Sequence, residues 1–259
     1  MNGERHESFS VGDHPRVEVR LASGRVRVLP GADGRVEATV VGRQAEDFVI
    51  EQFGQRISLY APEGPLPRWG SFDVTVTVPP GSALEARTAS ADLDVEAPLG
   101  ELSAHLASGQ VQAGDVDGEA RVRSASGDVR LGTVMGSLQV TTASGDVSLE
   151  GVRARASLQT ASGDLRVGVA LDELEVRTAS GDVNVDHFAG HHLDCKSISG
   201  DVVVGLAPGR TLDVDLTTLS GDIRNEFPMA PEASTGSGTA RVGVKTVSGD
   251  IRLRPARAS

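Results

Sequence analysis

Aspartate residues recur at a nearly constant interval along most of the chain. They are Asp92, Asp128, Asp146, Asp164, Asp182, Asp201, Asp222 and Asp250, and Gln110 stands at the one interrupted position. Carboxylate oxygens bind Ca²⁺ at ~2.3–2.6 Å, so a row of them could hold calcium, with Asp128, Asp146, Asp164 and Asp182 as the candidate ligands. One carboxylate per interval supplies few ligands, however. The pattern therefore favours aspartates that accept hydrogen bonds from backbone N–H groups in turns, with calcium binding as the alternative.

A second recurring position is rich in basic residues. It holds Arg87, His105, Arg123, Arg177, Lys196 and Lys245, with Thr141, Gln159 and Thr217 at the equivalent positions elsewhere. Such a row is usually a solvated face that offsets nearby acids, but repeat proteins also bind partners along extended faces. The pattern favours a solvated face. As the alternative, these six basic residues, together with Trp69, the only tryptophan, are the candidates for a surface that contacts a protein or envelope partner.

Three histidines and the only cysteine, His187, His191, His192 and Cys195, lie close together in the sequence and could bind zinc. Cys195 falls at a position that otherwise holds valine or leucine, which predicts a thiol in the core rather than a ligand. The chain carries no Ser/His/Asp or phosphate-loop motif, and its acidic residues are spread by the repeat rather than clustered. These features predict a non-catalytic scaffold or binding protein without a cofactor. A carbohydrate-active parallel β-helix enzyme and a self-assembling filament are the alternatives.

The element that must position these residues is an internal repeat. The serine of a recurring Ala-Ser-Gly-Asp sequence stands at Ser90, Ser108, Ser126, Ser144, Ser162 and Ser180, an interval of 18 residues, and returns at Ser199, Ser220 and Ser248. Three and five residues after each serine the side chains are mostly apolar, and the residue between them is mostly polar. Apolar residues also stand four and six residues before it. This alternation is typical of two half-buried strands joined by a turn.

Eighteen residues cannot bury an apolar face alone, so the repeats must stack and pair their backbones with one another. We predict an all-β fold: a β-solenoid, similar to a parallel β-helix, with 18-residue coils and an N-terminal β cap. The predicted organisation is a cap over residues 1–80, about nine coils over residues 81–254 with a flexible insertion at 228–240, and a tail at 255–259. Pro255 in that tail predicts a block to further strand pairing at the open C-terminal edge.

Within the cap, strands are expected at Arg16–Leu21, Arg25–Leu29, Val36–Val41, Phe48–Glu51, Ile57–Tyr60 and Phe72–Val78. A degenerate repeat shows at Ala22-Ser23-Gly24. Terminal repeats must cover the exposed end of a stack, which explains why this region departs from the strict pattern.

Charge and composition exclude several classes of protein. The net charge of −11 argues against nucleic-acid binding, because phosphate recognition needs a concentrated basic surface. Aromatic residues are only 3% of the chain, which suits a narrow core of valine, leucine and alanine. The single cysteine permits no internal disulfide, and the sequence shows neither a signal peptide nor a transmembrane segment. These features predict a cytoplasmic location, with attachment to a membrane only through a partner.

Three stretches carry a resemblance to a known family: DVTVTVPPGSALEARTAS, the serial units SASGDVRL, TASGDVSL and TASGDVNV, and the closing VKTVSGDIRLR. They are similar to the bacterial putative-adhesin family of β-strand-repeat proteins, whose function is unknown. The resemblance covers about residues 70–254. It implies a β-solenoid fold, no known catalysis and, for some members, a connection to the cell envelope.

Overall fold

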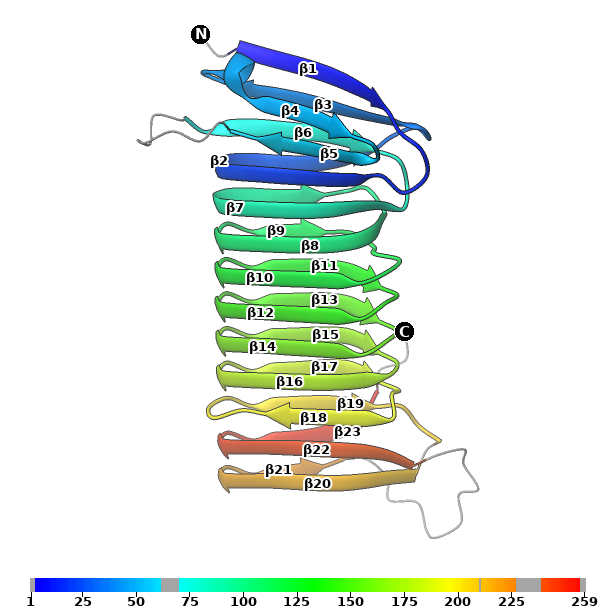
Figure 1. Cartoon of the computed structure of the whole chain (residues 1–259). Helices are drawn as coiled ribbons and strands as arrows, with labels where there is room; N and C mark the ends of the chain where they lie inside the picture. Colours follow the sequence, from blue (N-terminus) through cyan, green and yellow to red (C-terminus); the bar gives the residue numbers. More distant parts are fainter. Residues whose placement is uncertain (1–2, 62–69, 210, 227–238, 257–259) are drawn as a thin grey trace. The chain divides into compact units, whose positions relative to one another are not determined.

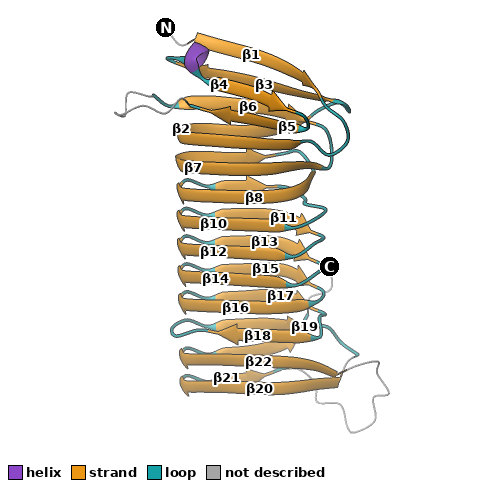
Figure 2. Cartoon of the chain, viewed as in Figure 1, coloured by secondary structure: helices purple, strands orange, loops and turns teal. Residues whose placement is uncertain are grey.

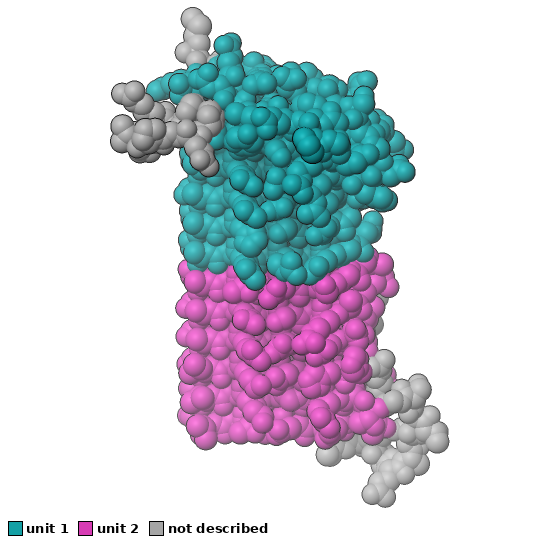
Figure 3. Space-filling model, in the orientation of Figure 1, with its two compact units in different colours: residues 1–132 teal, residues 133–259 magenta. Residues whose placement is uncertain are grey.

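The computed structural model describes residues 3–61, 70–209, 211–226 and 239–256. Almost all of its regular structure is β-strand (Figure 2). The chain forms two compact units, residues 1–132 and 133–259 (Figure 3). No helix in the described ranges is long and apolar enough to cross a membrane.

Each coil of the second unit contributes one strand to each of two parallel sheets (Figure 1). The first sheet includes β12 (Leu138–Ser144), β14 (Ala156–Ser162), β16 (Glu173–Ser180) and β18 (His192–Lys196). The second includes β13 (Val147–Val152), β15 (Leu165–Ala170), β17 (Val183–Phe188) and β19 (Val202–Leu206). Leu138 pairs with Ala156 and Val147 with Leu165, an offset of one repeat in both sheets. The predicted β-solenoid is therefore confirmed.

The core lies between the two sheets and follows the predicted apolar columns. In the first sheet Val140, Leu158, Val176 and Cys195 are at most 1% exposed. In the second sheet Val147, Leu165, Val183 and Val202 are equally buried. Small and medium side chains fill this space because the two sheets face each other across a narrow interior, about 10 Å from sheet to sheet.

The Ser-Gly-Asp turn requires glycine on two grounds. Gly163 has a φ of 128°, a backbone conformation that side-chain-bearing residues rarely adopt. A Cβ atom on Gly163 would also collide with the carbonyl oxygen of Gly145 in the neighbouring coil. Beside the turn, the buried Thr160 hydroxyl donates a hydrogen bond to the Ser162 carbonyl oxygen over 3.1 Å. The turn is thus braced within its own coil.

The first unit contains the same kind of coil. Its strands are β7 (Ser82–Val95), which runs through both sheets, β8 (Leu99–Ser108), β9 (Val111–Ala113), β10 (Ala120–Ser126) and β11 (Val129–Val134). Before them, β2 (Arg16–Pro30) is parallel to β7 from Arg16 opposite Ala83 to Val28 opposite Val95. Ser23 lies opposite Ser90, so the degenerate repeat forms a coil of its own.

Strands that pair with one another in antiparallel fashion cover this coil. They are β1 (Gly3–Ser10), β3 (Arg35–Gly42), β4 (Val49–Phe53), β5 (Arg56–Tyr60) and β6 (Phe72–Val78), with a short 3₁₀ helix η1 (Ala45–Asp47). β5 and β6 pair with β2 in parallel, whereas β4–β5, β3–β6 and β1–β3 are antiparallel. Phe48 and Phe72 pack edge to face, 5.1 Å between centroids. β1 was not predicted, because GERHESFS alternates without an apolar set and has no fully buried residue.

The last two coils stack in an order opposite to their order in the sequence. β22 (Thr239–Ser248) pairs with β18 on one side and with β20 (Thr211–Ser220) on the other. Likewise, β23 (Ile251–Pro255) lies between β19 and β21 (Ile223–Asn225) (Figure 1). The expectation that Pro255 guards the open edge is wrong, because Pro255 pairs with Leu206 and the edge belongs to β20 and β21. Most of the predicted insertion, residues 228–238, lies outside the described residues.

Candidate functional site: the charged face of the first unit

The outer face of the first sheet in the first unit carries two parallel rows of polar side chains. β4, β5, β2, β7, β8 and β10 lie side by side in this sheet, and outward residues at equivalent positions align across the strands. The acidic row contains Glu51, Ser58, Glu18 and Glu85 and continues into Ser103 and Arg121. The basic row contains Arg20, Arg87, His105 and Arg123 and is preceded by Val49 and Tyr60.

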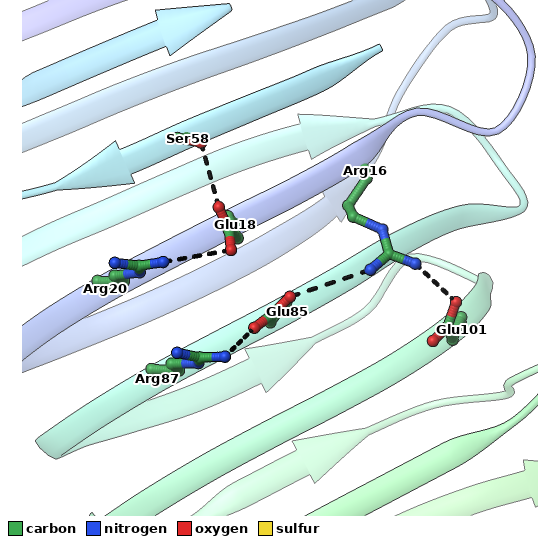
Figure 4. Close-up of polar contacts among 7 residues, drawn as sticks. All are labelled: Arg16, Glu18, Arg20, Ser58, Glu85, Arg87 and Glu101. Atoms are coloured by element: carbon green, nitrogen blue, oxygen red, sulfur yellow. Dashed lines mark hydrogen bonds and ion pairs between the residues drawn. The ribbon is translucent and has the colours of Figure 1, made fainter. Parts of the chain in front are cut away.

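Ion pairs connect the two rows over β2 and β7 (Figure 4). Arg20 is 3.4 Å from Glu18, and Arg87 is 2.7 Å from Glu85. Arg16 contacts Glu101 at 3.1 Å and reaches Glu85 at 4.0 Å (Figure 4). Exposed pairs of this type contribute about 0–1 kcal/mol each. Their main effect is to cancel charge over this part of the face.

This pairing of basic with acidic side chains does not extend to His105 on β8 and Arg123 on β10. His105 and Arg123 stand beside Ser103 and Arg121, neither of which supplies a carboxylate, and Arg121 is paired with Glu119. Within the described ranges Arg123 has no ion-pair partner. It lies directly opposite His105 on the adjacent strand β8. Partial burial lowers the pKa of His105 below 6.5, and the positive charges of Arg123 and Arg87 lower it further. A shallow hollow of about 430 Å³ is lined by Arg87, Thr88 and His105.

A second hollow lies where the cap meets β2. Its volume is about 620 Å³, and its polar lining includes Glu18, Arg20, Glu51, Ser58 and Tyr60. The Tyr60 hydroxyl donates to Glu51 Oε2 over 3.2 Å, and the Ser58 hydroxyl donates to Glu18 Oε2 over 3.3 Å. Sequence reasoning missed this hollow, because Glu51, Ser58 and Tyr60 belong to cap strands outside the repeat. The strands predicted for the cap did not indicate that these residues would line a common hollow.

The structure places the predicted basic residues in two groups. Arg87, His105 and Arg123 adjoin one another in the first unit, and Arg177, Lys196 and Lys245 adjoin one another in the second. In the second group each cation has a carboxylate partner: Arg177 pairs with Glu175, Lys196 with Asp194 at 2.7 Å, and Lys245 with Asp215 at 3.2 Å. Trp69 lies outside the described residues.

The aspartates of the turns form a hydrogen-bonded ladder. Asp146 Oδ1 accepts the backbone N–H of Asp164 over 2.9 Å, and Asp164 Oδ1 accepts that of Asp182, also over 2.9 Å. The ladder continues to Asp201, and Asp128 contacts Arg130 at 3.0 Å. In the part of the chain that the structure describes, no group of three or more His, Cys, Asp or Glu side chains is arranged to hold a metal ion. This arrangement can brace turns against one another, because each coil satisfies a backbone donor of the next.

The histidine and cysteine cluster does not converge on one point. Cys195 is 1% exposed among core residues, and burial raises the pKa of its thiol to about 12. His191 Nδ1 lies 2.8 Å from Asp172 Oδ1 on an exposed turn. His187 Nδ1 is buried without a hydrogen-bond partner. A protonated, buried thiol is a poor metal ligand.

These features define a β-solenoid repeat protein, and comparison identifies its family. Residues 16–254 match the Toastrack DUF4097 family model, so the chain belongs to that family. It is similar to the structure of a putative adhesin from Bacteroides fragilis, with a TM-score of 0.52 and 14% identity over 97% of both chains. A putative adhesin from Parabacteroides distasonis gives a TM-score of 0.51 and 15% identity, again over 97% of both chains. At this identity the likeness shows the fold alone. No match was found among curated proteins.

Proposed function

We propose that this chain is a non-catalytic scaffold that binds a protein or envelope partner on the charged face of its first unit. The observation that carries this proposal is the cation Arg123, which is unpaired among the described residues and lies in line with His105 and Arg87 on a chain whose net charge is −11. Over β2 and β7, Arg20 and Arg87 each pair with a carboxylate, whereas Arg123 has no ion-pair partner in the described ranges. Its neighbour His105 has a lowered pKa, which favours the neutral ring at pH 7, so His105 adds little positive charge. An acidic segment of a partner would supply the missing counter-charge.

Two structures with this fold are described as putative adhesins, and a binding role agrees with that description. Under this proposal the chain attaches to a membrane through its partner. Parallel strands also favour such a role, because they hold outward side chains about 4.8 Å apart on a rigid sheet.

The test is affinity capture from the native host, with membrane and soluble fractions compared by mass spectrometry. The wild-type chain should enrich the same envelope protein from the membrane fraction in replicate experiments. A variant with Arg87→Glu and Arg123→Glu should lose it. The matched control carries Arg177→Glu and Lys196→Glu on the second unit, where the cations are paired, and should retain it. Equal recovery by both variants would show that the charged face is not the binding surface, and recovery of the bait alone would contradict the proposal.

A carbohydrate-active enzyme is the second candidate, and the hollow beside the cap favours it. Glu18 and Glu51 both line that hollow, and only Glu18 belongs to a coil of the solenoid. Paired carboxylates are the catalytic groups of most glycoside hydrolases. Release of reducing ends from bacterial glycans, abolished by Glu51→Gln with no loss of folding, would establish this candidate over the scaffold.

A further inference from the structure

The coil formed by β20 and β21 is unpaired on one side. Among the described strands, β20 pairs only with β22, and β21 pairs only with β23. β20 is 10 residues long, so a full row of its backbone N–H and C=O groups faces outward from the stack. A long open edge of this kind is a template for another strand.

This coil also exposes apolar side chains that other coils bury. Val214 and Ile223 are 38% and 46% exposed, whereas Val242 and Ile251, at the same positions of the neighbouring coil, are both 0% exposed. The difference arises because nothing in the described chain covers the outer side of β20 and β21. The inward-facing apolar side chains of this last coil are therefore exposed, and they form an apolar surface at this end.

A row of apolar residues continues this surface along the turns. Where Ala143, Ala161 and Ala179 stand in earlier coils, the last three coils in stacking order carry Ile198, Val247 and Leu219. Their exposed fractions are 58%, 45% and 80%. Grouped exposed apolar residues mark interaction surfaces, whereas single ones do not.

The charges around this end are compensated within the coils themselves. Asp213 pairs with Arg241 at 3.4 Å, Asp215 with Lys245 at 3.2 Å, and Asp222 with Arg224 at 3.6 Å. The end therefore does not present an uncompensated acidic ring, and two such ends can approach each other despite the net charge of the chain.

We infer that this end binds the same end of a second copy of the chain, across a two-fold axis. β20 then lies antiparallel to β20 of the partner, β21 meets β21 of the partner, and apolar columns contact apolar columns. Antiparallel pairing satisfies the open backbone groups of both edges at once. A two-fold contact uses the same surface on both copies and is closed, so association stops at the dimer.

The edge strand β1 of the first unit is unsuited to such a contact. Its exposed positions hold Glu4, His6, Ser8 and Ser10, and charged or polar residues on an edge oppose strand addition. A head-to-tail contact between β20 and β1 would place the apolar end against these side chains. The structure therefore favours a closed dimer over the filament that the repeat alone allowed.

The size of the contact sets its strength. The ten residues of β20 and the three of β21, at ~3.3 Å per residue and in sheets ~10 Å apart, present an end on the order of 500 Å² with its side chains. Stable interfaces bury about 800 Å² per partner, so this dimer should dissociate in roughly the micromolar range.

Sedimentation velocity of the purified full chain between about 1 and 200 μM brackets that range. The mass should rise from 26.9 kDa toward twice that value and then level off. Raising the salt from about 0.1 to 1 M should not dissociate the dimer, because the contact is apolar. The double variant Val214→Lys with Ile223→Lys should remain monomeric.

Two further variants separate the contact from general effects. Leu171→Lys with Met135→Lys is the matched control, since these residues are 39% and 43% exposed in the same unit, and it should dimerise normally. Leu219→Ser, at an 80% exposed position, should weaken the dimer without affecting folding. Circular dichroism checks that all variants fold. A strict monomer at the highest concentration, growth beyond the dimer, or equal dissociation of the control would overturn the inference.

Discussion

At the scale of single residues, the turn aspartate has the clearest structural role. Asp164 accepts the N–H of Asp182 across coils, while its own N–H is accepted by Asp146. These carboxylates stand one strand spacing apart and repel one another, so the hydrogen bonds must offset the repulsion. The acceptor oxygen is therefore the feature of Asp164 that stabilises the coil, and its charge opposes stacking.

The variants Asp164→Ala and Asp164→Asn separate these two contributions. Alanine removes the acceptor and should lower the free energy of unfolding by about 1 kcal/mol. Asparagine keeps an acceptor oxygen and removes a repulsive charge, so its stability should equal or exceed that of the wild type at low salt. Urea denaturation of the three proteins measures both effects. If Asn costs as much as Ala, the carboxylate charge has a role that the ladder does not explain.

The electrostatic coupling between His105 and Arg123 gives a second residue-scale prediction. Arg123→Ser removes one of the positive charges that lower the pKa of His105, so this pKa should rise toward 6.5. It should stay below that value, because partial burial is the largest cause of the shift and Arg87 remains. NMR titration of the histidine ring measures it. Arg130→Ser removes an arginine paired with Asp128 and should leave the His105 pKa unchanged.

At the scale of elements, one repeat sequence produces coils of unequal stability. Interior coils pair on both sides, whereas the coil of β20 and β21 pairs on one. In a solenoid, stability is close to a sum over coils and their nearest-neighbour contacts. The β20–β21 coil should therefore open at a lower free energy than the coils beside it.

Equivalent valines in neighbouring coils test this difference in stability between coils. Val242→Ala empties a fully buried position and should cost about 2 kcal/mol. Val214→Ala occupies the same column but is 38% exposed in the wild type, and its cost should be less than half as large. Thermal or urea unfolding gives both values, measured at a concentration where the chain is monomeric. Equal costs would mean that Val214 is covered in solution.

At the scale of the whole molecule, stability depends on a core made mostly of aliphatic side chains, and the single cysteine permits no internal disulfide. Cys195 lies in that core, and its thiol keeps its proton up to a pKa of about 12, compared with 9.0 for a free thiol. Between these values the folded state binds a proton that the unfolded state has lost. Stability must therefore fall as the pH rises above 9.

The variant Cys195→Val isolates this contribution, because valine is the usual residue of that column. The free energy of unfolding of the wild type should decline more steeply above pH 9 than that of the variant, and the two curves should be parallel below it. Labelling by a thiol reagent at pH 8 should proceed only as fast as the chain opens. Rapid labelling of the native chain would show that Cys195 is accessible.

The sequence by itself determined the coil. Its 18-residue interval, its inward columns and its Ser-Gly-Asp turn all follow from local alternation, and the strands of the structure match them from β7 onward. Cys195 was correctly assigned to the core because its column is apolar in every other repeat. The basic residues were identified as a column because they recur at one position of the repeat.

Only the tertiary structure decided which coils are neighbours. Repeats with equivalent apolar columns can stack in any order, so periodicity does not encode that β22 lies between β18 and β20. The order depends on long-range backbone pairing, and it determines which apolar residues remain exposed. The same reason applies to the charged face. Glu51 and Tyr60 meet Glu18 and Arg20 because β5 pairs with β2 in parallel and β4 pairs with β5 antiparallel, contacts that no local pattern records.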